Sequence, residues 1–376
     1  MKKRTFLLAL GLTAALFVGY AAAVGGDAGD PLISLDFLDR VFRKQAETQI
    51  DEAIAAADGL LPNDAKTRWD NAVSSVETNI DSDYTATFLE TRVKQGDALS
   101  GATGLQILPL AGEMTALFSS GTVIDVTEGT ELASGSTLLT NHRYLVAEDT
   151  FARFVCGSKT AVISYCGRYR LSPSDTPDYT AMAAALKSLR LFRGTGAGIG
   201  SGYELEKTPT RAEALIMLIR LLGEEDAALA CTASNPFVDV PAWFAPYAAY
   251  AYEKGYSNGI GKDRYGKDLF GTQYEASAVM YAEFLLRALG YSSTATTDIS
   301  DSLDRAVTAG VLTAAERTAI QSSGFLRADI VYLSYYALSA RTSGGTVLSQ
   351  KLINAGVFSA EDYRAAQTAV TTARLS

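Results

Sequence analysis

The sequence predicts an α+β protein with an N-terminal helical segment, a small β domain and an all-α C-terminal region. Apolar residues recur at helical spacing near the N-terminus, and short alternating runs separated by turn residues fill the middle of the chain. The last half holds apolar helical patterns and no strong strand signal. With 376 residues, of which 48% are hydrophobic and 20% charged, the chain is globular and long enough for two or three domains.

Residues 1–23 have the features of a secretory signal peptide. The basic stretch MKKRT precedes the apolar run FLLALGLTAALFVGY, and three alanines follow as a small-residue cleavage site. A membrane anchor is the alternative, because the run is near the minimum length for a span. A Gly-rich stretch without a flanking charge comes next, which favours cleavage near Val24. The mature chain would then have no membrane span and would work outside the cytoplasmic membrane.

A helical hairpin or short stalk is expected over residues 24–83. A second helical pattern, DAKTRWDNAVSSVETNI, begins after a break at LPN. The first helical pattern, LDFLDRVFRKQAETQIDEAIAAA, lies before this break. Its apolar residues at helical spacing are Leu38, Val41, Phe42, Ala46 and Ile50.

Residues 84–172 are expected to form a small β sandwich or barrel. Runs such as GTVIDVTEG and HRYLVAED alternate, and turn residues separate them about every eight to twelve positions. A hairpin turn is predicted at residues 157–159. This turn would set Cys156 opposite Thr160 instead of Cys166, which argues against a disulfide between the two cysteines.

Three apolar helices recur at uneven spacing in residues 178–343. When IRLLG is aligned with LRALG, Arg220 matches Arg287, 67 residues further on. When TRAEA is aligned with LRADI, Arg211 matches Arg327, 116 residues further on. Each apolar helix follows an earlier helix and a loop with Gly and aromatic residues. Residues 344–376 then form a helical tail of two short amphipathic helices.

The first of these helices carries an arginine that its capping does not explain. Thr210 and Glu213 fit the T-x-x-E capping box, in which each side chain caps the backbone N–H of the other residue. A cation in the first turn, such as Arg211, is disfavoured by the helix dipole by roughly 0.3–1 kcal/mol. Two alternatives follow: Arg211 points to water, or it binds an anion beside the free N–H groups of the helix start.

The other two copies favour the anion. The third copy keeps Arg327 but has Leu326 at the capping position, whereas the second copy has Ser277 as a cap and Ala278 in place of the arginine. Capping and the arginine therefore vary independently. We expect an anion-binding role for Arg211 and for Arg327.

Two stretches of this region share the pattern of a known family. TRAE at residues 210–213 matches its helix-opening signature, and FVDVPAWFAPYAAYAYEKGYSNGIG at residues 237–261 matches its F-x-D-V opening, aromatic residue and Gly-rich turn. The region thus resembles three degenerate repeats of the S-layer homology (SLH) module, a bacterial cell-wall-binding unit. This resemblance implies a pseudo-threefold helical domain that binds secondary cell-wall polymers, often through a pyruvylated sugar whose carboxylate meets the signature arginine.

The resemblance also implies which residues would form the ligand site. Arg211 and Arg327 would meet the anion, Trp243 would pack on a sugar face, and Asp239 would orient its loop or a hydroxyl group. Trp243 could equally belong to the core. Because the second copy lacks the arginine and the third lacks a clear equivalent of Trp243, at most two of the three grooves should bind ligand.

Several other functions find no sequence signal. A net charge of −9 argues against a general nucleic-acid binder, which needs a basic face. His142 is the only histidine and has no Cys or His neighbours at ligand spacing, so no metal or cofactor is expected. Asp and Glu total 42, yet no pair is marked by its neighbours as a glycosidase dyad. The chain is therefore expected not to be an enzyme.

Three functional hypotheses remain. The first is a secreted protein held non-covalently on the cell wall of a Gram-positive-type bacterium through an anionic secondary polysaccharide. The second is a structural or assembly protein whose repeats contact other chains, including copies of itself. The third is a wall-acting glycoside hydrolase with the β domain as its catalytic unit, which a filled β interior would argue against.

Overall fold

The computed structural model of the chain describes residues 41, 43–58, 83–196, 198–291, 298–322 and 324–376. The chain divides into two compact units, Met1–Asp81 and Ser82–Ser376, and each is considered by itself. In the first unit the described residues form one helix, α3 (Arg43–Asp58). The predicted signal peptide and the second half of the predicted helical hairpin lie outside the described residues.

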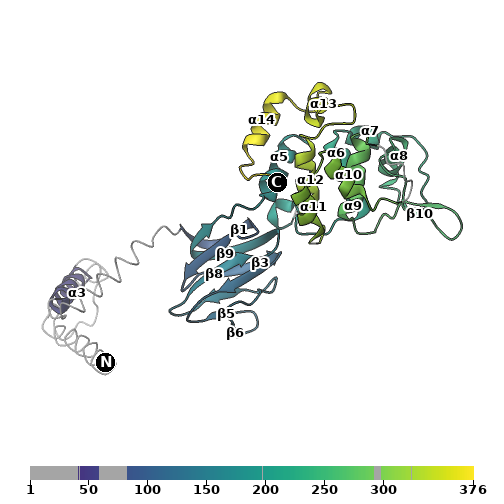
Figure 1. Cartoon of the computed structure of the whole chain (residues 1–376). Helices are drawn as coiled ribbons and strands as arrows, with labels where there is room; N and C mark the ends of the chain where they lie inside the picture. The colour runs from purple at the N-terminus through teal and green to yellow at the C-terminus, as the bar shows by residue number, and fades with distance from the viewer. Residues whose placement is uncertain (1–40, 42, 59–82, 197, 292–297, 323) are drawn as a thin grey trace. The chain divides into compact units, whose positions relative to one another are not determined.

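The second unit begins with a curled antiparallel sheet that forms a half-barrel (Figure 1). Its strands run in the order β4-β8-β2-β9-β3-β7-β5-β6. Strand β1 lies outside this order and pairs with β9. The strands are β1 (Asp83–Lys94), β2 (Ala98–Ala102), β3 (Gln106–Ala111), β4 (Met114–Leu117), β5 (Val123–Asp125), β6 (Thr130–Leu132), β7 (Tyr144–Val146), β8 (Phe151–Cys156) and β9 (Thr160–Ser172).

The prediction of a hairpin turn at residues 157–159 is wrong, because the strands on either side of it do not pair with each other. The chain does reverse there, but β8 pairs with β2 and β4, whereas β9 pairs with β1, β3 and, at its far end, β2. The reason is that β2 lies between β8 and the end of β9. Cys156 therefore stands opposite Met114, and all three cysteines are free.

Apolar side chains fill the concave interior of the sheet. They come from β1, β2, β3, β4, β5, β7, β8 and β9 and form one cluster. A strand that buries alternate residues in this way is stabilised by removing apolar area from water. The largest fully buried members include Leu99, Ile107, Met114, Tyr144, Phe154, Ile163 and Tyr165.

The rest of the second unit is helical apart from one hairpin, whose two strands have two residues each. They are β10 (Gly261–Lys262) and β11 (Asp268–Leu269), and the sequence did not predict them. None of the described helices is long and apolar enough to cross a membrane. The helices are α5 (Tyr179–Ser188), η2 (Gly200–Gly202), α6 (Arg211–Leu221), α7 (Glu225–Leu229), α8 (Ala245–Glu253), α9 (Ala278–Ala288), α10 (Ser302–Thr308), α11 (Ala314–Gln321), α12 (Arg327–Ala337), α13 (Leu348–Asn354) and α14 (Ala360–Thr368).

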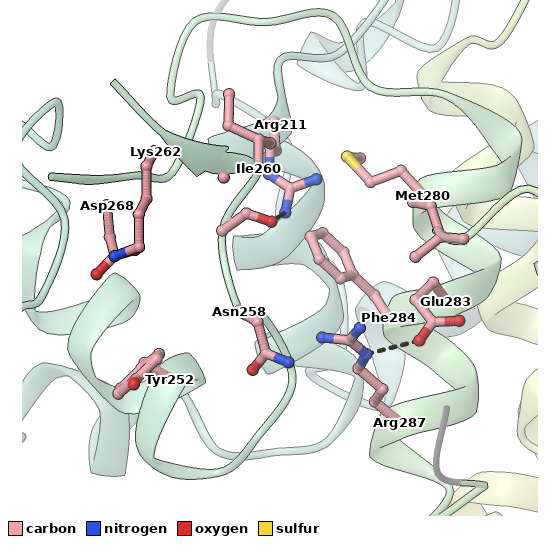
Figure 2. A pocket seen from close by; sticks show the side chains of 13 residues that line it. Arg211, Tyr252, Asn258, Ile260, Lys262, Asp268, Met280, Glu283, Phe284 and Arg287 are labelled. Atoms are coloured by element: carbon pink, nitrogen blue, oxygen red, sulfur yellow. Dashed lines mark hydrogen bonds and ion pairs between the residues drawn. The ribbon is translucent and has the colours of Figure 1, made fainter. Parts of the chain in front are cut away.

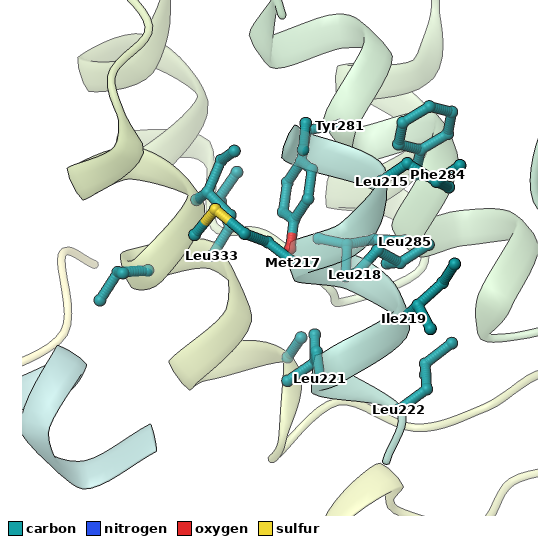
Figure 3. Packing of buried hydrophobic residues seen from close by; sticks show 14 of the residues in the cluster. Leu215, Met217, Leu218, Ile219, Leu221, Leu222, Tyr281, Phe284, Leu285 and Leu333 are labelled. Carbon is teal, nitrogen blue, oxygen red and sulfur yellow. The ribbon is translucent and has the colours of Figure 1, made fainter. Parts of the chain in front are cut away.

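Helices α6, α9 and α12 form the centre of the helical region (Figure 3). Each has 11 residues, and they begin at Arg211, Ala278 and Arg327, the positions matched in the sequence repeat. Each of the three contacts the other two. Leu218 and Leu285 are almost completely buried between them, and the Tyr281 hydroxyl forms a 2.7 Å hydrogen bond with the Ser334 hydroxyl.

Backbone hydrogen bonds tie the starts of these helices to one another. The N–H of Arg211 donates to the carbonyl of Tyr274, in the segment before α9, at 2.7 Å. In the same way, the N–H of Arg327 donates to the carbonyl of Lys207, in the segment before α6, at 2.8 Å. The helix starts are thus fixed close together.

Two buried ion pairs join the sheet to the helical region within the second unit. Arg92 of β1 bonds Glu206 at 2.7 Å, and Lys159 of the β8–β9 turn bonds Asp329 of α12 at 2.7 Å. Buried pairs of this kind fix the relative position of two elements, because breaking either one leaves an uncompensated charge away from water.

We predict that Leu218→Ala lowers the free energy of unfolding by about 2–5 kcal/mol, because the cavity would lie among three tightly packed helices. Leu229→Ala is the matched control. Its side chain is 54% exposed, so the change should stay within about 0.5 kcal/mol. Urea unfolding followed by circular dichroism measures both. Equal effects of the two substitutions would contradict the central position of α6.

Candidate functional site

A pocket of about 780 Å³ lies between α9 and the loop that follows α8 (Figure 2). This volume is within the range of small-molecule binding sites. Cationic, acidic, aromatic and aliphatic side chains share its wall. The lining residues are Arg211, Tyr252, Asn258, Gly259, Ile260, Gly261, Lys262, Asp268, Met280, Glu283, Phe284, Arg287 and Ile299.

Arg211 enters this pocket from the first turn of α6 and is only 6% exposed. One of its terminal nitrogens, Nη2, donates to the Ser257 hydroxyl at 3.1 Å and to the Gly259 carbonyl at 3.3 Å. Its Nε is buried and has no hydrogen-bond partner among the described residues. The alternative in which Arg211 points to water is therefore wrong.

Two aromatic rings hold the Arg211 guanidinium group in place. Its central carbon lies 5.0 Å from the centroid of the Phe270 ring and 5.0 Å from that of Phe284. Cation–π contacts of this kind are strongest where water is excluded. Together with the bonds to Ser257 and Gly259, the two rings fix the position of the group.

The charge of Arg211 has no carboxylate partner within 4.0 Å among the described residues. Burial and, to a smaller extent, the nearby Arg287 lower the pKa of Arg211 from its ordinary 12.5 to about 10, although Asp239 acts in the opposite direction. At neutral pH the group is still a cation. A buried, unpaired cation is costly, and an anion in the adjoining pocket would offset that cost.

The other charges of the pocket wall are paired. Arg287 Nε bonds Glu283 at 2.6 Å, and Lys262 bonds Asp268 at 2.8 Å. The wall thus contains three cations and two carboxylates, and both carboxylates are already matched. The uncompensated positive charge is that of Arg211.

Glu283 holds the α9 side of the wall together. Besides Arg287, its carboxylate accepts bonds from the Ser302 hydroxyl at 2.8 Å and from Arg305 at 2.9 Å. Burial acts to raise the pKa of Glu283, but the bonds from Arg287 and Ser302 outweigh burial and hold the pKa below its ordinary value. The carboxylate is therefore charged at neutral pH and positions Arg287 toward the pocket.

The expectation of free N–H groups at the start of α6 is wrong. The N–H of Arg211 donates to the Tyr274 carbonyl, and that of Ala212 to the Thr272 carbonyl at 3.4 Å. The segment before α9 supplies both acceptors because it packs across the helix start. The first N–H groups of α6 are therefore not available to an anion in this pocket.

Thr210 and Glu213 form the capping box that their spacing predicts. The Thr210 hydroxyl accepts from the Glu213 N–H at 3.3 Å, and the Glu213 carboxylate accepts from the Thr210 N–H at 2.7 Å. These two residues start the helix and so fix where Arg211 lies.

Arg327 is equally buried but differently surrounded. It is 7% exposed, its Nε donates to the Tyr203 carbonyl at 3.4 Å, and its Nη1 lies 4.0 Å from the Glu213 carboxylate. Burial lowers the pKa of Arg327, whereas Glu213 and Glu204 raise it. Nearby acids thus compensate the charge of Arg327, and it does not line the pocket of Arg211.

Asp239 and Trp243 lie outside the pocket wall. The Asp239 carboxylate accepts from the N–H groups of Phe270 and Gly271, each at 2.7 Å, so it holds the loop that carries Phe270 beneath Arg211. Trp243 is 59% exposed, which excludes the alternative of a core residue. Of the residues proposed from the sequence, only Arg211 reaches the pocket directly.

The sequence reasoning missed the other charged residues of the pocket wall, which include Arg287, Glu283 and Lys262. Arg287 and Glu283 lie four residues apart on α9, a spacing that indicates an ion pair on one helix face. Arg287 had served only to align the repeats. Lys262 lies in the hairpin that the sequence did not predict, so no local signal placed it near Arg211.

Comparisons with known proteins give no assignment. No protein-family model matches the sequence, and no curated protein matches it. The geometry of the pocket therefore carries the functional argument.

We predict that Glu283→Gln lowers the free energy of unfolding at pH 7 by about 1–3 kcal/mol, because two arginines lose their shared charge partner. The pKa of Glu283 is lower in the folded state than in the unfolded state. Glu283 therefore stabilises the fold fully above the unfolded-state pKa, and this contribution is lost as the pH falls through the folded-state pKa. The variant should therefore lose less stability on acidification than the parent chain. Unfolding curves between pH 7 and pH 3 measure this, with the exposed Glu131→Gln as control.

Proposed function

We propose that this chain is a secreted, cell-wall-associated protein that binds an anionic secondary wall polysaccharide in the Arg211 pocket. The observation that carries the proposal is the buried Arg211 guanidinium group, whose Nε and charge are both unmatched beside a pocket of about 780 Å³. An acidic group on a sugar would supply the missing negative charge beside the guanidinium group.

The remaining pocket wall suits a sugar ring. The Arg287–Glu283 and Lys262–Asp268 pairs present both donors and acceptors for hydroxyl groups. Tyr252 offers an apolar face at the same wall. The exposed Trp243 is available to pack on a sugar of the same polymer outside the pocket.

The wider context comes from the sequence. The predicted signal peptide places the mature chain outside the cytoplasmic membrane, and the resemblance to SLH modules points to the wall of a Gram-positive-type bacterium. The compensated charge of Arg327 argues against a second anion site at the start of α12. We therefore assign ligand contact to Arg211 and loop support to Asp239, with no cofactor or metal.

Arg211→Gln should lower binding to purified Gram-positive cell walls by about 10-fold or more, because a charge-assisted hydrogen bond contributes about 1.5–3 kcal/mol. Co-sedimentation measures the bound fraction before and after acid removal of the secondary polymer. Arg327→Gln is the matched control: a second buried arginine at a helix start, whose loss should leave binding nearly unchanged.

Raising the salt concentration should weaken the interaction of the parent chain. Thermal unfolding of both variants separates lost binding from lost folding. Binding that is the same without the polymer, or the same in both variants, would rule out the proposed site.

Self-assembly is the second candidate function, and one observation favours it. Strand β1 pairs only with β9 among the described strands, and its Tyr84, Phe88 and Leu89 are 65%, 42% and 45% exposed. An exposed apolar edge strand is a template for pairing with another chain. The hydrolase hypothesis has no comparable support, because apolar side chains fill the described interior of the β domain.

If β1 pairs with a second copy, Tyr84→Lys should reduce self-association by at least several-fold, since a charge at a sheet edge blocks strand addition. Sedimentation velocity over a range of protein concentrations measures this. Tyr265→Lys is the control, because Tyr265 is 71% exposed but lies in the loop between β10 and β11. A parent chain that stays monomeric at high concentration would exclude assembly through β1.

A further inference from the structure

The three central helices present equivalent faces, and these can be compared position by position. The α9 wall of the Arg211 pocket consists of its third, sixth, seventh and tenth residues. Because α6, α9 and α12 have the same length and aligned starts, the same positions mark the corresponding faces of the other two. These residues are Met280, Glu283, Phe284 and Arg287 on α9; Asp329, Tyr332, Leu333 and Tyr336 on α12; and Glu213, Ile216, Met217 and Arg220 on α6.

The chain itself covers the third position of the α12 face. Lys159, in the turn between β8 and β9, bonds both carboxylate oxygens of Asp329 at 2.7 Å and the Gly324 carbonyl at 3.1 Å. The side chain of Asp329 is only 3% exposed. A cation from the β domain thus already fills this end of the face.

Residues near the C-terminus cover the sixth and tenth positions of α12. The N–H of Leu375 donates to the Tyr332 hydroxyl at 3.1 Å, and the Arg374 guanidinium group lies 4.8 Å from the centroid of the Tyr336 ring. Arg374 also bonds the fully buried Glu316 at 2.6 Å. The cavity left beside Lys159 and Leu375 has a volume of about 20 Å³, which is room for about one water molecule.

On the α6 face the charges are compensated, although the face is not covered. Glu213, at its third position, lies 4.0 Å from the Arg327 guanidinium group. Arg220, at its tenth position, bonds Glu225 at 2.7 Å. Both cations near this face therefore have a carboxylate beside them, and neither resembles the unmatched Arg211.

We infer that the chain binds one anionic sugar group at a time, in the Arg211 pocket, because its own residues fill or neutralise the two equivalent faces. This inference rests on the proposed function and specifies its stoichiometry. A protein chain with one site cannot bind two neighbouring units of the polymer at once, so it gains no avidity from them. It also gives the β domain a defined role, since its turn supplies the Lys159 that fills the α12 face.

Isothermal titration calorimetry of the mature chain with a pyruvylated monosaccharide tests this inference. We expect one ligand bound per chain, at least about 10-fold weaker binding for Arg211→Gln, and an unchanged stoichiometry of one for Arg327→Gln. Native mass spectrometry of the same mixtures gives an independent count of bound ligands. Thermal unfolding confirms that each variant is folded.

The possible failures can be told apart. Two or three ligands per chain would overturn the single-site inference but leave the proposed function in place. One ligand whose binding is lost with Arg327→Gln and kept with Arg211→Gln would also overturn the inference, since the open site would then lie beside Arg327 at the α6 face. If the parent chain binds neither this sugar nor the acid-released wall polymer, the proposed function fails, and the inference fails with it.

Discussion

The packing of α6, α9 and α12 against one another is the constraint on which the rest of the described helical region depends. Three apolar helices in mutual contact leave little surface for water, so side chains at their starts are buried whatever their polarity. Arg211 and Arg327 are both buried for this reason. The same packing brings the segments before the helices across each other's first turns, where they take up the backbone N–H groups.

A buried arginine can be stabilised from within the chain or from outside it. The first case applies to Arg327, which has Glu213 beside it. For Arg211 we propose the second case, because the rings of Phe270 and Phe284 surround it and the largest charge effect on it comes from another cation, Arg287. The two positions look equivalent in the sequence, yet their electrostatic surroundings differ: the largest charge effect on Arg211 comes from the cation Arg287, whereas that on Arg327 comes from Glu213. This difference is why a ligand is proposed for one and not for the other.

The contacts between the sheet and the helical region help to fill the α12 face and leave the Arg211 pocket open. Lys159 and Arg92 place the β domain against α12 and the segment before α6, away from the lining of the Arg211 pocket. Residues near the C-terminus add Arg374 at the α12 face. The open pocket and the filled face thus result from one arrangement of the chain.

Local signals in the sequence determined the strand-rich middle of the chain, the start of each central helix and the capping box of Thr210 and Glu213, because these depend on spacing between near neighbours. They also singled out Arg211. Only the tertiary structure decided that β8 pairs with β2 instead of β9, that Glu213 lies beside Arg327, and that Lys159 reaches Asp329. These contacts join residues about 50 to 170 positions apart, where no local periodicity carries information. Whether a buried charge is matched depends on such contacts, so the open pocket at Arg211 could be recognised only in the fold.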